Sequence, residues 1–146
     1  MAHILRFMPQ LLLLISSALV AWGVLGLVEY GVPAVSFGLQ HPNFPAGTQF
    51  LHFFAILVTG LVFLMGYYLR WSGTPFATVT MYAVLATLCF VETVDFDAFG
   101  GGTRRFIPMA IEYCLYVALS VYLLRSPAMH RRFSSRPSAS EAQETP

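Results

Sequence analysis

Four long apolar segments dominate this chain and constrain its fold more than any local motif. They lie at about residues 10–30, 49–71, 76–96 and 106–125. A helix needs roughly 20 mainly apolar residues to cross the hydrocarbon core of a bilayer, and each segment meets that length. Ser72-Gly73-Thr74-Pro75 separates the second and third segments by so few residues that the helices on either side must be antiparallel. The sequence therefore predicts an all-α membrane protein, an antiparallel bundle of four transmembrane helices.

Composition supports a lipid environment for most of the chain. Of the 146 residues, 57% are hydrophobic and only 10% are charged, whereas soluble domains carry about 25% charged residues. So few charges leave too little polar surface for a water-facing shell. We expect residues 1–125 to form the transmembrane domain. Residues 126–146, rich in Ser, Pro and charge, are expected to form a disordered cytoplasmic tail.

The first segment has an alternative interpretation. Arg6 precedes the run LLLLISSALVA, a pattern also found in secretory signal peptides. The apolar run nevertheless continues to Val28, and no clear small-x-small cleavage site closes it. We therefore expect a retained helix, with a cleaved signal peptide as the alternative.

The arginines predict how the bundle is oriented. In an up-down-up-down bundle only Arg104 and Arg105 fall on the side opposite the termini. Six arginines share the side of the termini, namely Arg6, Arg70, Arg125, Arg131, Arg132 and Arg136. Because positive residues concentrate on the cytoplasmic side, both termini are predicted to be cytoplasmic.

Each apolar segment contains one ionisable residue near the side away from the termini, called the far side below. These residues are Glu29, His52, Glu92 and Glu112, and Asp95 follows close to Glu92. A charged side chain at mid-bilayer costs about 2.5–3.5 kcal/mol, so these groups are expected to face the bundle interior. Glu112 is the deepest, roughly 10 Å inside the start of its helix at about 1.5 Å per residue. The alternative is that Glu29, His52, Glu92 and Asp95 lie at the membrane–water boundary, where charge costs little.

Helical periodicity places aromatic side chains on the same faces as these groups. At about 100° per residue, Tyr82 lies on the face of Glu92, Tyr116 on that of Glu112, and Trp22 on that of Glu29. The tyrosine hydroxyls can donate hydrogen bonds to carboxylates. The sequence therefore predicts a far-side pocket whose proposed ligand contacts are Tyr82, Tyr116, Glu29, Asp95 and Trp22, with Glu112, Glu92 and His52 as candidate catalytic residues.

Three functions fit this pattern. The first is binding of a lipophilic small molecule in the far-side pocket, with acid–base chemistry of the isomerase or cyclase type. Glu112 would be the proton donor and Glu92 or His52 the base. The alternatives are a non-catalytic accessory subunit of a larger membrane complex and a proton or ion pathway. The sequence leaves open whether the protein is an enzyme.

No cofactor or metal is predicted. His52, Glu92 and Glu112 are suitable ligand types, but the chain has no Glu-x-x-His pair of the kind that helical di-metal sites use. Cys89 and Cys114 form no CxxC motif and are interpreted as buried free thiols. With a net charge of +1 and no basic stripe, nucleic-acid binding is not predicted. The expected partners are the lipid bilayer, a lipophilic small molecule, and a membrane-protein partner or a second copy of the chain.

Overall fold

The computed structural model describes residues 2–32, 34–40, 44–96 and 102–134, with side chains described from residue 7 onward. Within these ranges there are five α-helices, one 3-10 turn and no strand. The helices are α1 (Ala2–Gly31), α2 (Ala46–Leu69), α3 (Thr74–Asp95), α4 (Phe106–Arg125) and α5 (Pro127–Phe133), and the turn η1 is Thr103–Arg105.

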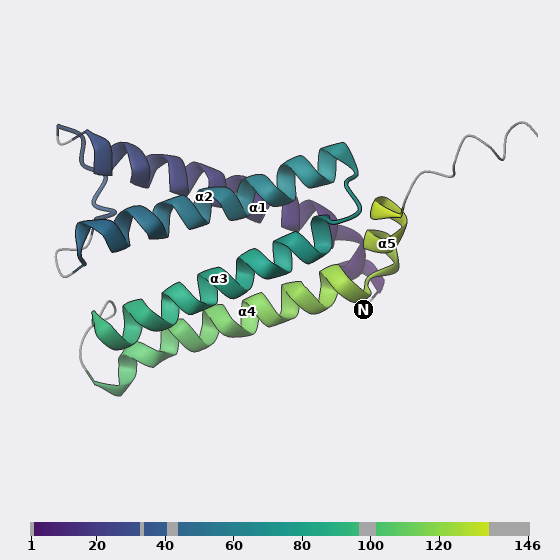
Figure 1. Ribbon diagram of the computed structural model, residues 1–146. Coiled ribbons are helices and arrows are strands. Elements are labelled where there is room, and N and C mark those ends of the chain that lie inside the picture. The colour runs from purple at the N-terminus through teal and green to yellow at the C-terminus, as the bar shows by residue number, and fades with distance from the viewer. Residues whose placement is uncertain (1, 33, 41–43, 97–101, 135–146) are drawn as a thin grey trace, which may run out of the picture.

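The four long helices form an antiparallel bundle in which each helix packs on the next along the chain (Figure 1). Four segments are long and apolar enough to span a membrane, namely Phe7–Gly31, Ala46–Leu69, Thr74–Asp95 and Thr103–Arg125. The predicted all-α architecture with four apolar spans is confirmed.

Local backbone conformation explains why α2 begins and ends a few residues earlier than expected. α2 begins at Ala46 because Pro45, whose φ is −56°, occupies the N-cap. α2 ends at Leu69 because Arg70 adopts a left-handed conformation with φ of 52°. The N–H of Trp71 then donates to the carbonyl of Gly66 over 3.0 Å, which satisfies a carbonyl at the helix end. The α2–α3 connection is therefore a tight turn.

Glycines bring the backbones of α1 and α2 close together. A Cβ atom placed on Gly60 would lie 2.6 Å from the carbonyl oxygen of Ser16, and one on Gly23 would lie 2.7 Å from the backbone nitrogen of Leu57. Without side chains at these two positions the helices gain van der Waals contact, which is the main attraction between helices in lipid.

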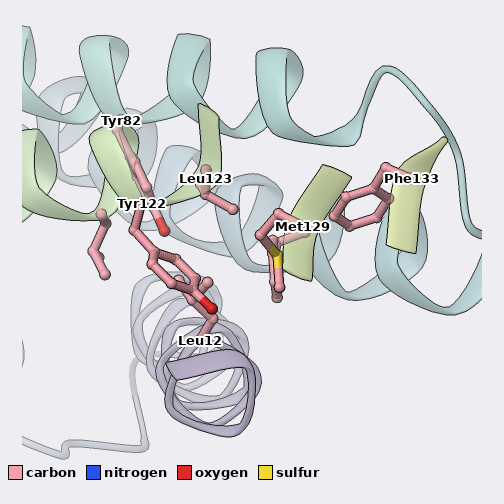
Figure 2. Close-up of a cluster of buried hydrophobic side chains, with 8 residues drawn as sticks. Leu12, Tyr82, Tyr122, Leu123, Met129 and Phe133 are labelled. Carbon is pink, nitrogen blue, oxygen red and sulfur yellow. The ribbon is translucent and has the colours of Figure 1, made fainter. Parts of the chain in front are cut away.

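The main hydrophobic cluster lies toward the end of the bundle where α5 is found. Figure 2 shows that its side chains come from α1, α3, α4 and α5. With one further residue from α2, the buried members are Leu12, Phe63, Tyr82, Leu119, Tyr122, Leu123, Met129 and Phe133. The cluster joins α1 to α4, which are not neighbours along the chain.

The structure differs from the expectation of a disordered segment at 126–146. Residues 127–133 form α5, because Met129 and Phe133 lie one turn apart and bury 99% and 96% of their surface in the cluster. Arg132 reinforces this docking. Its guanidinium lies 4.4 Å from the ring centroid of Tyr67, and its Nη2 donates to the Tyr67 carbonyl over 3.1 Å. Residues 135–146 lie outside the described residues.

The bundle therefore has two unlike ends, visible in Figure 1. The α5 end contains the start of α1, the turn at residues 70–73 and α5. The loop end contains the connections from α1 to α2 and from α3 to α4. These names are used below.

Candidate functional site

A histidine–carboxylate contact links α2 and α3 near the loop end. His52 lies in the second turn of α2 and Glu92 in the last turn of α3, and the antiparallel packing brings their side chains together. His52 Nδ1 lies 2.6 Å from Glu92 Oε1, while the two side chains are 30% and 4% exposed. A short hydrogen bond to a carboxylate is strong where water is excluded. Glu92 is thereby stabilised, while the His52 side chain remains partly exposed.

A third helix adds a second carboxyl group. The thiol of Cys89, one turn before Glu92, interacts with the side chain of Glu112 on α4. Cys89 is 5% exposed, and Glu112 is half-buried. We call His52, Cys89, Glu92 and Glu112 the polar cluster. It contains all three side chains predicted as catalytic candidates.

Cys89 is the member of this cluster that sequence reasoning assigned no chemical role. Its position three residues before Glu92 does place it on the same helical face. The interaction with Glu112 depends on how α4 packs against α3, which the face pattern of one helix does not define.

The predicted tyrosines lie together, but farther toward the α5 end. The rings of Tyr82 and Tyr116 are stacked with centroids 5.5 Å apart. Tyr82 is ten residues from Glu92, which corresponds to about 15 Å along the helix axis. The hydroxyl of Tyr82 is buried and has no hydrogen-bond partner among the described residues. The expected hydrogen bond from Tyr82 to a carboxylate is therefore not found among the described residues.

An apolar groove runs between α3 and α4 beside this tyrosine pair. Its volume is about 420 Å³, and it is lined by side chains from residues 79–86 of α3 and 113–125 of α4. The polar contributors are Tyr82, Tyr113, Tyr116, Ser120 and Arg125. The hydroxyl of Tyr113 donates to the carbonyl of Ala86 over 2.8 Å and so ties the two walls together. The groove contains the two predicted tyrosines but none of the polar cluster.

Glu29 lies in a different environment. Its side chain is 5% exposed, and its oxygens accept hydrogen bonds from the N–H of Leu39 over 3.0 Å and from the Ser36 hydroxyl over 3.4 Å. These donors belong to the connection between α1 and α2. Glu29 therefore anchors that connection against the end of α1.

Trp22 and Asp95, both predicted as ligand contacts, are exposed at the surface of the bundle. The connection before α2 packs against the end of α3. The ring of Phe44 makes an edge contact with that of Phe96, with centroids 5.8 Å apart, and the amide of Gln49 donates to the Phe44 carbonyl over 2.9 Å. This connection thus covers part of the loop end beside α3.

The polar cluster is suited to proton exchange. It combines an imidazole with two carboxyl groups, of which that of Glu92 is buried. In the part of the chain that the structure describes, no group of three or more His, Cys, Asp or Glu side chains is arranged to hold a metal ion.

Four apolar spans with an ionisable cluster near one end define the class: a small, helical, multi-pass membrane protein. No protein-family model, no curated protein and no solved structure matches the chain.

Proposed function

We propose that this protein binds a lipophilic small molecule whose polar group is received by the polar cluster, and that the cluster moves protons on that molecule. The observation that carries the proposal is the contact between His52 and Glu92 at 2.6 Å inside two membrane-spanning helices. Ionisable side chains at such positions are costly and are most often kept for function.

The contact assigns distinct roles to the two partners. Glu92 accepts a hydrogen bond from Nδ1 of His52, which orients the ring and leaves Nε2 as the nitrogen that accepts a proton from the bound molecule. Glu112 comes from α4, where it interacts with Cys89, and is the proton donor. An isomerisation fits this pair, because His52 removes one proton and Glu112 returns one, so no co-reactant is consumed.

The groove between α3 and α4 supplies a place for the apolar part of the molecule. Most of the side chains that line it are apolar. Several of these side chains, such as that of Val117, which is 63% exposed, face the lipid. Tyr116 in the groove is one turn beyond Glu112, a separation of about 6 Å along the axis. A molecule of modest length thus reaches from the groove to Glu112, and it enters laterally from the bilayer.

The experiment is purification in a mild detergent, followed by mass spectrometry of the small molecules that remain bound. We expect the unaltered protein to retain a lipophilic molecule and His52→Gln and Glu112→Gln to lose it or to leave it unconverted. Asp95→Asn is the matched control, because it removes an exposed carboxylate from the same end of α3. Equal retention and conversion by all four proteins would contradict the proposal.

A proton pathway is the second candidate, and buried hydroxyls favour it. Thr78 is 0% exposed, yet its hydroxyl has no partner among the described residues, and the same holds for the hydroxyls of Tyr82 and Tyr122. Unpaired buried hydroxyls are often satisfied by internal water, and such water would extend from the polar cluster toward the α5 end. Under this alternative His52→Gln would abolish proton flux into vesicles and the purified protein would hold no lipophilic molecule.

For orientation, we propose that both termini are cytoplasmic. The support is the arginine distribution: Arg70, Arg125, Arg131 and Arg132 lie at the α5 end, against Arg104 and Arg105 at the loop end. The polar cluster would then lie toward the opposite side of the membrane.

A further inference from the structure

The α5 end of the molecule has a strongly one-sided charge. Arg70, Arg125, Arg131 and Arg132 belong to the α2–α3 turn and to the region around α5. Residues 60–91 and 113–134, which build most of this end, contain no Asp or Glu. The described carboxylates lie instead at or near the loop end. These arginines therefore have no carboxylate partner among the described residues of their own end.

The docking of α5 determines which of these charges face outward. Arg132 is held against Tyr67 by its ring contact and by its hydrogen bond to the Tyr67 carbonyl. With Met129 and Phe133 buried, the opposite face of α5 carries His130 and Arg131, and both are exposed. Arg125, just before α5, is exposed as well. Because α5 is docked in this way, Arg125, His130 and Arg131 form a basic surface at a fixed position of the α5 end.

A cleft opens beside this surface. It has a volume of about 340 Å³ and lies between the start of α3, the end of α4 and α5. Phe76, Leu123, Leu124 and Met129 provide apolar walls, and Ser72, His130 and Ser134 provide polar groups. Phe76 is 75% exposed, so the cleft is continuous with the lipid-facing surface of α3. Arg131 is next in sequence to the lining residue His130. Arg125 is next to the lining residue Leu124 and itself lines the neighbouring groove between α3 and α4.

We propose that this cleft binds one anionic phospholipid. An acyl chain lies along Phe76 and Leu124, and the phosphate of the headgroup is received by Arg125, His130 and Arg131. Two features together favour this occupant. The cleft passes from an apolar wall to a polar rim. Arg125 and Arg131, each next in sequence to a lining residue, are exposed and have no carboxylate partner among the described residues. A zwitterionic lipid fits the apolar wall equally well but gains less from the arginines. The proposal is independent of the polar cluster.

The test uses the full chain purified in a zwitterionic detergent. Phosphatidylglycerol and phosphatidylcholine with identical acyl chains are added, and bound lipid is counted by native mass spectrometry. We expect phosphatidylglycerol to be retained preferentially. Arg131→Gln is expected to weaken its binding about fivefold and the double variant Arg125→Gln/Arg131→Gln roughly 30-fold, since each arginine near the headgroups contributes about 1 kcal/mol.

Two variants serve as matched controls. Arg104→Gln removes an exposed arginine from the loop end and is expected to leave lipid binding unchanged. Arg131→Lys keeps the charge and is expected to restore most of the binding. A thermal melt of each variant in detergent shows whether it is folded, so weakened binding by a folded Arg131→Gln protein supports the site.

Three results would overturn the proposal. The first is equal retention of the two lipids, and the second is equal weakening by Arg104→Gln and Arg131→Gln. The third is displacement of phosphatidylglycerol by inorganic phosphate at the same concentration as by a second phospholipid. That result would identify a site for free phosphate that does not use the acyl chain.

Discussion

At the scale of single residues, the acidic side chains of the spans have different roles although they resemble one another in the sequence. Glu92 is paired with His52, and Glu112 is joined to Cys89, both inside the bundle. Glu29 is about as buried as Glu92 but accepts its hydrogen bonds from Leu39 and Ser36. The hydrogen-bond partner of each carboxyl group, rather than its burial, therefore distinguishes a candidate catalytic residue from one that anchors the structure.

Glu29→Ala is therefore expected to loosen the α1–α2 connection without affecting the polar cluster. The substitution leaves the N–H of Leu39 without its acceptor, and losing such a bond costs about 1–3 kcal/mol when the group stays buried. Hydrogen exchange followed by mass spectrometry should show faster exchange across residues 36–40. Asp95→Ala, at an exposed carboxylate, is the control, and unchanged exchange in Glu29→Ala would show that the anchor is not needed.

At the scale of elements, the two pairs of helices are held by different means. α1 and α2 approach closely because glycines remove side chains from their contact. α3 and α4 are joined by larger side chains, including the stacked rings of Tyr82 and Tyr116 and the hydrogen bond from Tyr113 to Ala86. These larger side chains also border the groove. The groove proposed to hold the apolar part of the ligand is thus formed by α3 and α4, the helix pair that packs with bulky side chains.

Gly60→Ala is expected to destabilise the bundle, because the new Cβ would lie 2.6 Å from the Ser16 carbonyl and 2.8 Å from Cγ2 of Val20. Overpacking of this type costs typically about 1–3 kcal/mol. A thermal melt in detergent should show a lower midpoint than that of the unaltered protein. Gly47→Ala provides the control, since a Cβ there meets nothing within 4 Å. Equal midpoints for the two variants would mean that α1 can move away from α2 at little cost.

At the scale of the whole molecule, charge is divided between the two ends. The described carboxylates lie toward the loop end with the polar cluster, and the α5 end carries the arginines that no described carboxylate neutralises. The proposed ligand site and the proposed phospholipid site therefore lie toward opposite membrane surfaces.

This division predicts that the two ends are accessible from opposite sides of the membrane. Cysteines introduced by Ser134→Cys and Gly47→Cys, both at exposed positions, should react with a membrane-impermeant maleimide from different sides of sealed vesicles. With cytoplasmic termini, intact cells should label Gly47→Cys and not Ser134→Cys. The unaltered chain, with Cys89 and Cys114 inside the spans, gives the background. Labelling of both variants from one side would contradict a four-span topology.

Much of the fold was predictable from sequence, because lipid imposes a simple rule. Backbone polar groups must bond within each span, so length and apolar content alone predict four helices, and the short connection at residues 72–75 predicts their antiparallel order. The cost of placing charge in lipid indicated that His52, Glu92 and Glu112 face inward. Neither argument predicted α5, because the composition after Arg125 is polar and the two side chains that dock it, Met129 and Phe133, are too few to give a periodic signal.

The sequence by itself determined that the chain is helical, that it carries four apolar spans, and that the acidic residues of these spans and His52 lie toward one end. Only the tertiary structure decided which of these residues meet: it paired His52 with Glu92, joined Cys89 to Glu112, turned Glu29 to its own connection and left Trp22 exposed. The physical reason is that hydrophobicity and periodicity act along a single helix. Contact between side chains depends instead on the rotation and axial offset of one helix against another, which glycine contacts and bulky side chains determine only once the helices have packed.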